Sequence, residues 1–241
     1  MSALQKTVKA ERIKLRRSPV WLAFFGLPLI SAFFGTNNYR MNLGLLKSEW
    51  FSLWSQHSLF LCYLFMPALI GTYCSYLWRL EHQRSNWNSF LTAPVSHFAL
   101  YFGKLFQGAL MTILGNAWVF FLYIVCGKLC GLNTPVPKAV LSWFLCGTLG
   151  GVVVCCIQLT ISMTIRSFAI PIGIALMGSI GGLLITNKGL GLFYPYSLYA
   201  MGMRANNPQM ELAVGQFLSG CVVYILLCCI ISVWKLKQGE S

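Results

Sequence analysis

The sequence predicts an all-α membrane protein with six transmembrane helices and an amphipathic interfacial helix at its amino terminus. Of its 241 residues, 57% are hydrophobic and only 10% are charged, whereas soluble domains carry roughly 25% charged residues. Apolar windows of about 20 residues, the length that crosses the hydrocarbon core, recur along the chain. Basic residues gather at the ends of these windows, as anchors at a membrane surface do.

Residues 1–18 are expected to form the interfacial helix. Leu4, Val8 and Leu15 are spaced to fall on one side, and six basic residues between positions 6 and 17 surround them. A basic amphipathic segment directly before a hydrophobic one is typical of a helix that lies in the membrane interface. The apolar run after Pro19 lacks a small-residue cleavage site, so we interpret the segment as uncleaved and not as a signal peptide.

Six spans follow, within one domain that covers residues 1–241. The fifth span is rich in glycine and carries Pro171. Because small residues allow close helix packing in membranes, we expect this span to be buried among its neighbours. The expected spans are 19–36, 58–78, 98–126, 139–163, 168–186 and 213–234.

The distribution of basic residues predicts the orientation. With both termini in the cytoplasm, the cytoplasmic segments hold twelve lysine and arginine residues and the outer segments hold six. This bias agrees with the positive-inside rule and favours a multi-pass protein of the bacterial cytoplasmic membrane.

Two outer segments, 37–57 and 187–212, are rich in aromatic residues, which we expect to form the interfacial belt. Contact with an amphipathic substrate is the alternative interpretation. The aromatic residues concerned are Trp50, Phe51, Trp54, Tyr194, Tyr196 and Tyr199.

The composition excludes most catalytic and metal chemistry. There are five acidic residues, no aspartate, and three histidines on different loops without an HExxH pattern. Most of the ten cysteines fall inside apolar runs, where cysteine packs as a small hydrophobe. The main polar residues within the expected spans are Gln107, Asn116 and Gln158. They either form hydrogen bonds between helices or provide polar contacts in a pore. We therefore expect no catalytic residue, metal or cofactor in this chain.

The chain also lacks a phosphate-binding loop of its own. Its two Gly-Lys pairs, at 103–104 and 127–128, lack the earlier glycine of G-x-x-x-x-G-K-[ST] and are followed by leucine. Mid-span charges are scarce, which argues against an ion-coupled carrier. Energy for any transport is therefore expected from a partner.

Residues 79–97 form the longest connection on the cytoplasmic side. Residues 87–91 can form a short amphipathic helix that exposes Trp87, Phe90 and Leu91, and Pro94 would end it. Ser96 is well placed to cap the next helix. The segment is either an ordinary interfacial loop or a helix that docks in a groove on a cytoplasmic partner.

The motifs around this loop resemble those of a known family. Glu81, then residues 90–96 (FLTAPVS) and 103–105 (GKL), resemble the pattern of ABC-2 type permeases. Residues 11–19 (ERIKLRRSP) are similar to the amino-terminal connecting helix of that family, and six spans match its length. Within this family, the overall sequence most resembles that of lantibiotic immunity permeases. One departure is the sequence Ser-Asn-Trp at 85–87, where the family often has a glycine-threonine pair.

The resemblance implies the ABC-2 permease fold and a role in expelling a peptide antibiotic from the membrane. It also implies a second permease subunit, identical or homologous, and two copies of a separate ATPase that binds ATP and magnesium. Residues 79–97 would be the coupling loop, and a non-transporting scaffold or peptide sensor is the alternative. The ATPase-coupling residues would be Glu81, Arg84, Trp87, Phe90, Leu91 and Pro94.

Overall fold

The computed structural model describes residues 2–83 and 95–238, and this part of the chain contains helices and loops without a strand. Six helical segments are long and apolar enough to cross a membrane, the second being formed by α3, η1 and α4 in direct succession. The helices are α1 (Ala3–Arg16), α2 (Val20–Met41), α3 (Glu49–Phe60), the π-helical η1 (Leu61–Phe65), α4 (Met66–His82), α6 (His97–Leu129), α7 (Lys138–Thr164), α8 (Ala169–Asn187), the 3-10 helix η2 (Gly191–Phe193), α9 (Ser197–Gly202) and α10 (Val214–Gln238).

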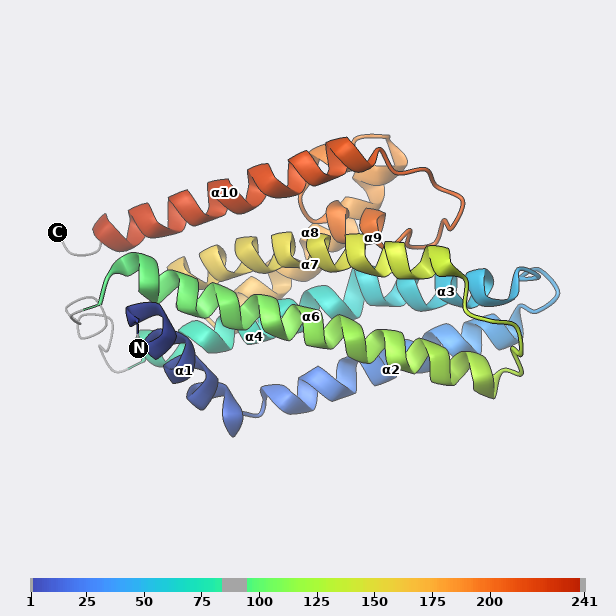
Figure 1. Ribbon diagram of the computed structural model, residues 1–241, viewed down its shortest axis with the longest axis horizontal. Helices are drawn as coiled ribbons and strands as arrows, with labels where there is room; N and C mark the ends of the chain where they lie inside the picture. The colour runs from blue at the N-terminus through green and yellow to red at the C-terminus, as the bar shows by residue number, and fades with distance from the viewer. Residues whose placement is uncertain (1, 84–94, 239–241) are drawn as a thin grey trace.

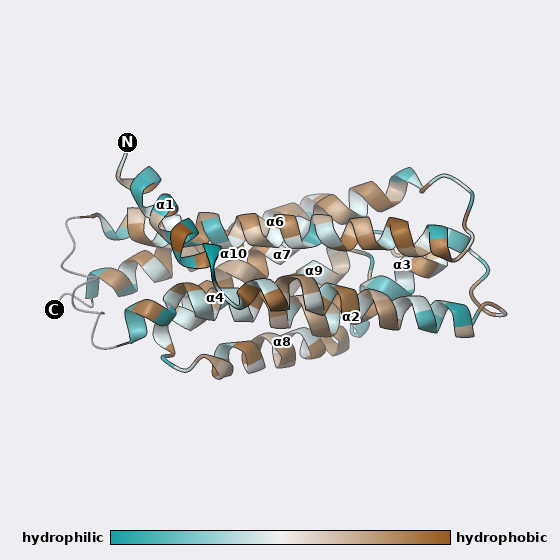
Figure 2. Ribbon diagram, turned by 90° about the horizontal axis from the view of Figure 1, so that it is seen from below, coloured by the Kyte–Doolittle hydropathy of each residue, from teal (hydrophilic) through white to brown (hydrophobic). Residues whose placement is uncertain are grey.

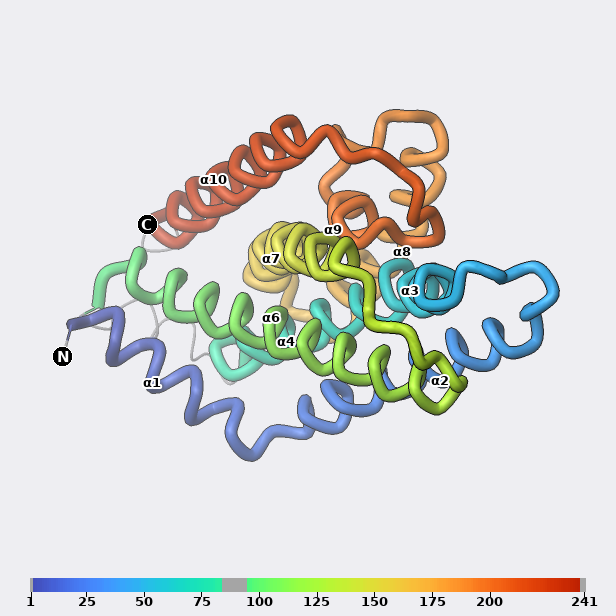
Figure 3. The backbone as a smooth tube through the Cα atoms, turned by 45° about the vertical axis from the view of Figure 1, so that its right-hand side comes forward, coloured from blue at the N-terminus to red at the C-terminus, as the bar shows by residue number. Residues whose placement is uncertain are grey.

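The long helices run along one direction and form an elongated bundle (Figures 1 and 3). The start of α1, the end of α4, the start of α6 and the end of α10 lie at the same end, which we call the terminal end (Figure 1). The links from α2 to α3 and from α6 to α7 lie at the opposite, far end. Hydrophobic residues colour the middle of the long helices, whereas α1 and the helix ends are more hydrophilic (Figure 2).

The second apolar helical segment begins at Glu49 rather than near residue 58, and Trp50 and Trp54, expected in an interfacial belt, pack inside the bundle. Trp50 and Trp54 are only 1% and 2% exposed. Their indole Nε1 atoms donate to the carbonyls of Thr134 at 2.9 Å and Met203 at 2.7 Å. Indoles suit an interface because they are apolar with one polar group, and here an internal carbonyl replaces water as the acceptor.

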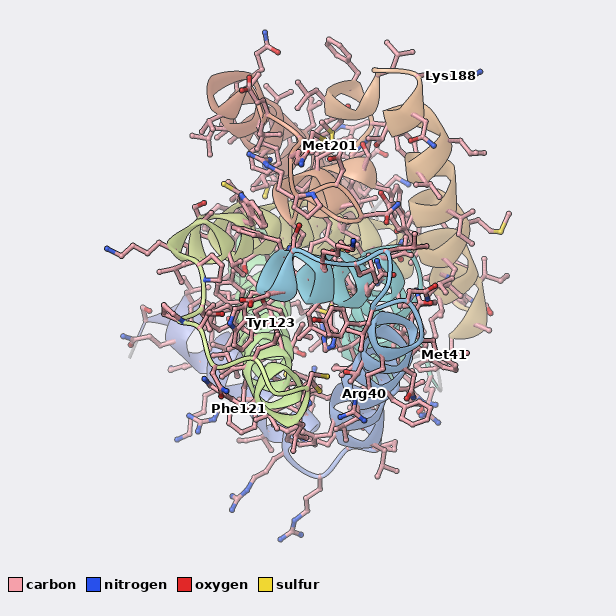
Figure 4. All side chains as sticks on the ribbon, turned by 90° about the vertical axis from the view of Figure 1, so that its right-hand side faces the viewer. Arg40, Met41, Phe121, Tyr123, Lys188 and Met201 are labelled. Atoms are coloured by element: carbon pink, nitrogen blue, oxygen red, sulfur yellow. The ribbon has the colours of Figure 1, made fainter. Side chains whose placement is uncertain are left out.

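Tyr123 completes this aromatic group from α6. Its hydroxyl donates to the carbonyl of Trp50 at 2.9 Å, and its ring meets Trp54 edge-to-face with centroids 5.0 Å apart. Viewed from the far end, Tyr123 lies between α6 and α3, whereas Phe121 is exposed on the outside (Figure 4). The start of α3 is therefore held inside the bundle.

The fifth membrane-crossing helix, α8, is not buried all round, contrary to the expectation from its glycines. Its buried residues lie three or four positions apart, so they form a single stripe along one side. Packing on this stripe is close, because a Cβ on Gly71 of α4 would lie 2.9 Å from the Cα of Ile172. The stripe consists of Pro171, Ala175, Ser179 and Gly182.

The segment between α8 and α10 turns back into the bundle, which corrects the expectation of an interfacial belt for Tyr196 and Tyr199. Their side chains are 7% and 1% exposed. A Cβ on Gly150 would lie 2.6 Å from the carbonyl oxygen of Leu198, and a Cβ on Gly202 would lie 2.6 Å from the carbonyl carbon of Cys146. The absence of side chains at these two glycines lets α9 pack directly on α7.

Substitution of Gly150 by alanine tests this packing. The added methyl group would collide with backbone atoms of α9, so we expect a lower midpoint of thermal unfolding in detergent. Gly26→Ala is the matched control, because a Cβ there meets nothing within 4 Å. Alanine is favoured over glycine in a helix by about 1 kcal/mol, so the control should be neutral or stabilising. Equal stability of both variants would contradict the placement of α9.

Candidate functional site

Four charged side chains meet at the terminal end and form what we call the charge cluster. Glu11 and Lys14 come from α1, Glu81 from the last turn of α4, and Lys104 from two turns inside α6. Glu11 and Glu81 are 5% and 4% exposed, and Lys104 is fully buried. The cluster therefore joins three helices from two distant parts of the sequence.

Lys104 is the centre of the cluster. Its Nζ lies 2.6 Å from Oε1 of Glu81 and 2.9 Å from Oε1 of Glu11. It also donates to the carbonyl of Leu77 at 2.6 Å, and it lies 4.7 Å from the ring centroid of Trp78. Lysine has three N–H donors, and two carboxylates with one carbonyl give each donor an acceptor.

Lys14 bridges the same two carboxylates from the outer side. Its Nζ lies 2.7 Å from Oε1 of Glu11 and 2.7 Å from Oε1 of Glu81, and its side chain is 27% exposed. Burial by itself lowers the pKa of Lys14, but the two carboxylates outweigh that effect and raise the pKa above 10.5. Because the pKa is raised on folding, the stabilisation from this lysine is complete at neutral pH and is lost only in strongly alkaline solution.

Local sequence features bring these helices into position. Ser2 and Gln5 form a capping box at the start of α1. Ser96 caps α6 by accepting from the amide of Ala99, as its position in the sequence predicts. The hydroxyl of Thr7 donates to the carbonyl of Ala99 at 2.9 Å. Thr7 also packs on Gly103, where an added Cβ would lie 2.7 Å from its hydroxyl oxygen. The amphipathic helix α1 therefore packs along the beginning of α6.

The electrostatic balance of the cluster explains its stability. Two carboxylates face two ammonium groups, so the group as a whole carries no net charge. Removal of one partner from a buried ion pair leaves an uncompensated charge and costs about 3–5 kcal/mol. The ends of α4 and α6, which flank the connection 83–96, are thus held to each other and to α1.

The structure places Glu81 inside the protein rather than on its surface. Its side chain faces Lys14 and Lys104, so it supports the base of the connection from within. Lys104, which belongs to the segment GKL at 103–105, is fully buried within α6. The other predicted coupling residues lie outside the described part of the chain: Arg84, Trp87, Phe90, Leu91 and Pro94.

The three polar residues expected at depth are all buried, at 0–5% exposure. Asn116 accepts from the hydroxyl of Tyr199 at 2.7 Å, and the side-chain amide of Gln158 lies 2.7 Å from the hydroxyl of Tyr196. Both bonds fasten the segment that contains α9 to the membrane-crossing helices. Gln107 lies on α6, three residues beyond Lys104.

Glu11, Lys14 and Lys104 are the site residues that the sequence reasoning missed. The sequence did contain a signal for Glu11. The chain has only five acidic residues, and this one lies within its most basic segment, which favours an ion pair. The spacing of Glu11 and Lys14, three positions apart on a helix, also permits an ion pair.

Replacement of Lys104 by methionine should destabilise the protein strongly. The variant leaves two buried carboxylates with one lysine, so we expect a loss of about 3 kcal/mol, seen as a lower unfolding midpoint and lower yield. The double variant Glu81→Gln/Lys104→Met leaves Glu11 paired with Lys14, and it should recover part of the loss. Lys9→Met, at an exposed position of α1, is the control. A Lys104→Met protein as stable as Lys9→Met would contradict the role of the cluster.

Comparison with known proteins shows the family to which the chain belongs. No curated protein matches the chain. The family model described as ABC-2 family transporter protein matches residues 7–182, a region that includes most of α1, the charge cluster and the connection between α4 and α6. Members of this family are the membrane component of a transporter that works with an ABC ATPase, and they are not themselves the catalytic component. The chain is a multi-pass membrane protein that belongs to the ABC-2 transporter family.

Proposed function

We propose that this chain is the transmembrane permease subunit of an ATP-binding-cassette exporter that expels a lantibiotic or similar amphipathic peptide antibiotic from the membrane. Its termini would lie in the cytoplasm of a bacterial cell, as the distribution of basic residues indicates. The observation that carries the proposal is the charge cluster, because it ties the two helices flanking residues 79–97 to α1.

Residues 79–97 would receive the movement of the ATPase. The partner, in two copies, would hold ATP and magnesium and contact Arg84, Trp87, Phe90, Leu91 and Pro94. Force on the loop would act on the end of α4 and the start of α6 together, because Glu81 and Lys104 are paired. Helices that are held together in this way move as near-rigid bodies.

A second permease, identical or homologous, would complete the membrane part of the exporter. The outward faces of α8 and α10 support this expectation, since only 22% of the apolar window of each helix is buried in the single chain. These faces are apolar, and an apolar helix face in a membrane contacts either lipid or another helix.

The far end has the mixed character that an amphipathic peptide requires. A cavity of about 290 Å³ lies between α2 and α6, with Leu29 and Phe33 on its apolar side and Thr36, Asn37 and Arg40 on its polar side. A peptide with one apolar and one polar face could contact both sides at once. This cavity is our candidate for substrate contact.

The alternative is a membrane scaffold, or a sensor that binds the peptide antibiotic without moving it. Such a protein would have the same membrane-crossing helices. It would not require a connection that transmits ATP-driven movement, so the two functions differ in whether residues 84–94 control ATP hydrolysis by a partner.

Purification of the tagged chain from its native host in mild detergent is the first test of partnership. We expect a P-loop ATPase to co-purify, together with a second permease if the membrane part is a heterodimer. Recovery of the chain alone in several detergents would favour the scaffold or sensor.

Substitutions in the connection test the coupling. We expect Phe90→Ala and Pro94→Ala to be expressed normally, but to abolish substrate-stimulated ATP hydrolysis and lower antibiotic tolerance about tenfold, equivalent to about 1.4 kcal/mol of lost coupling. Met41→Ala is the control, at an 85% exposed position of the far end. Glu81→Ala should also lower tolerance, with an accompanying loss of stability from the charge cluster. Full tolerance in both loop variants would contradict the assignment of the coupling loop.

A further inference from the structure

Two adjoining cavities lie at the terminal end, between the ends of α4, α7 and α10 and the start of α8. Their volumes are about 270 and 140 Å³, and both are lined by His82 and Arg166. We call the two together the basic pocket. Its defining side chains are Ser75, Arg79, His82, Ser162, Arg166 and Lys235.

The pocket is positively charged and is not neutralised from within the described chain. None of the described residues that line either cavity is acidic. Within residues 2–83 and 95–238, the side chains of Arg79, Arg166 and Lys235 form no ion pair. The neighbouring carboxylate in the sequence, Glu81, is already engaged by Lys14 and Lys104. Among the residues that the structure describes, three cations therefore surround one recess without a matching anion.

Hydrogen-bond donors form the floor of the pocket. Nε2 of His82 lies 2.8 Å from the carbonyl oxygen of Ser162, and a carbonyl only accepts, so Nε2 carries a proton. The hydroxyls of Ser75 and Ser162, 5% and 2% exposed, lie 3.4 Å apart. One hydroxyl donates to the other, which leaves one proton to turn toward an acceptor in the cavity. The site thus favours an anion with several oxygen atoms.

The pocket also differs from an ordinary row of anchoring residues at a membrane surface. Arg16 and Arg17 at the end of α1 are exposed and line neither cavity. Arg79, in the last turn of α4, and Arg166, in the link between α7 and α8, are also exposed, but they line one recess beside the apolar residues Ile165 and Phe168. Phe168 is 41% exposed at the start of a membrane-crossing helix, so the polar recess borders an exposed apolar surface.

We propose that the basic pocket binds the phosphodiester headgroup of an anionic phospholipid from the leaflet at the terminal end. The planar guanidinium groups of Arg79 and Arg166 suit paired hydrogen bonds to phosphate oxygens, and Lys235 adds a mobile positive charge. Basic pockets between transmembrane helices are known to take such headgroups. One water occupies about 30 Å³ in the liquid, so the 270 Å³ cavity has room for a phosphate with part of its glycerol.

Lipid is favoured over an acidic side chain of a partner by the position of the pocket. It is bounded by the ends of four membrane-crossing helices, where headgroups are expected, and it adjoins the exposed Phe168, directly before α8. A bound lipid would bridge α4, α7, α8 and α10. The proposal is independent of the substrate of the exporter and of the coupling loop.

The test measures lipid binding by the full-length chain in dodecyl maltoside. Dioleoyl phosphatidylglycerol, dioleoyl phosphatidylcholine and inorganic phosphate are titrated separately, and bound lipid is counted by native mass spectrometry alongside the thermal unfolding midpoint. We expect only phosphatidylglycerol to bind and stabilise the wild-type protein. Arg79→Gln/Arg166→Gln should bind it about tenfold more weakly, whereas Arg16→Gln/Arg17→Gln, with the same loss of charge at the same end, should bind it normally.

A third variant protects the test against a folding defect. Arg79→Lys/Arg166→Lys keeps the charge but loses the paired hydrogen bonds, so its affinity should fall between those of the wild type and the glutamine variant. If the double glutamine variant does not fold, Arg166→Gln alone, in the exposed link between α7 and α8, replaces it with the same expected direction.

Three results would overturn the proposal. The first is equal phosphatidylglycerol binding by the pocket variants and the Arg16→Gln/Arg17→Gln control. The second is stabilisation by inorganic phosphate with no further effect of lipid, which would make the pocket a site for a free anion. The third is normal lipid binding by the pocket variants together with failure of the ATPase to co-purify with them, which would make the pocket a docking site for an acidic partner.

Discussion

The burial of Lys104 is the constraint on which the terminal end of this protein depends. An ammonium group removed from water must be surrounded by acceptors, and here they come from Glu11, Glu81 and the carbonyl of Leu77. These groups belong to α1 and α4, so the burial of one lysine requires both helices to lie against α6. The helices on either side of the connection 83–96 therefore form one mechanical unit.

The same requirement organises the middle of the bundle with neutral groups. Asn116 and Gln158 contact the hydroxyls of Tyr199 and Tyr196, and Trp54 donates to the carbonyl of Met203. A polar group in an apolar interior is costly unless it is hydrogen-bonded. These contacts explain why the segment after α8, which leaves a membrane-crossing helix at the far end, returns among α6 and α7 instead of lying on the surface.

Charge is distributed differently on the two sides of α4 at the terminal end. On the side facing α1 and α6, two acids and two lysines neutralise one another. Around the pocket next to α7 and α8, Arg79, Arg166 and Lys235 lack such a counterpart within the described residues. The first arrangement holds helices together by itself, and the second is suited to an anion from outside the chain.

The all-helical class, the six membrane-crossing segments and the cap at Ser96 could be predicted from the sequence, because they depend on local apolar length and on side chains a few residues apart. Tertiary structure alone decided that Lys104 meets Glu11, 93 positions away, and that Trp50, Tyr196 and Tyr199 are buried. An aromatic or basic residue near the end of a span has the same local pattern whether it faces the interface or the interior. Only the neighbouring helices supply the acceptors that make burial favourable.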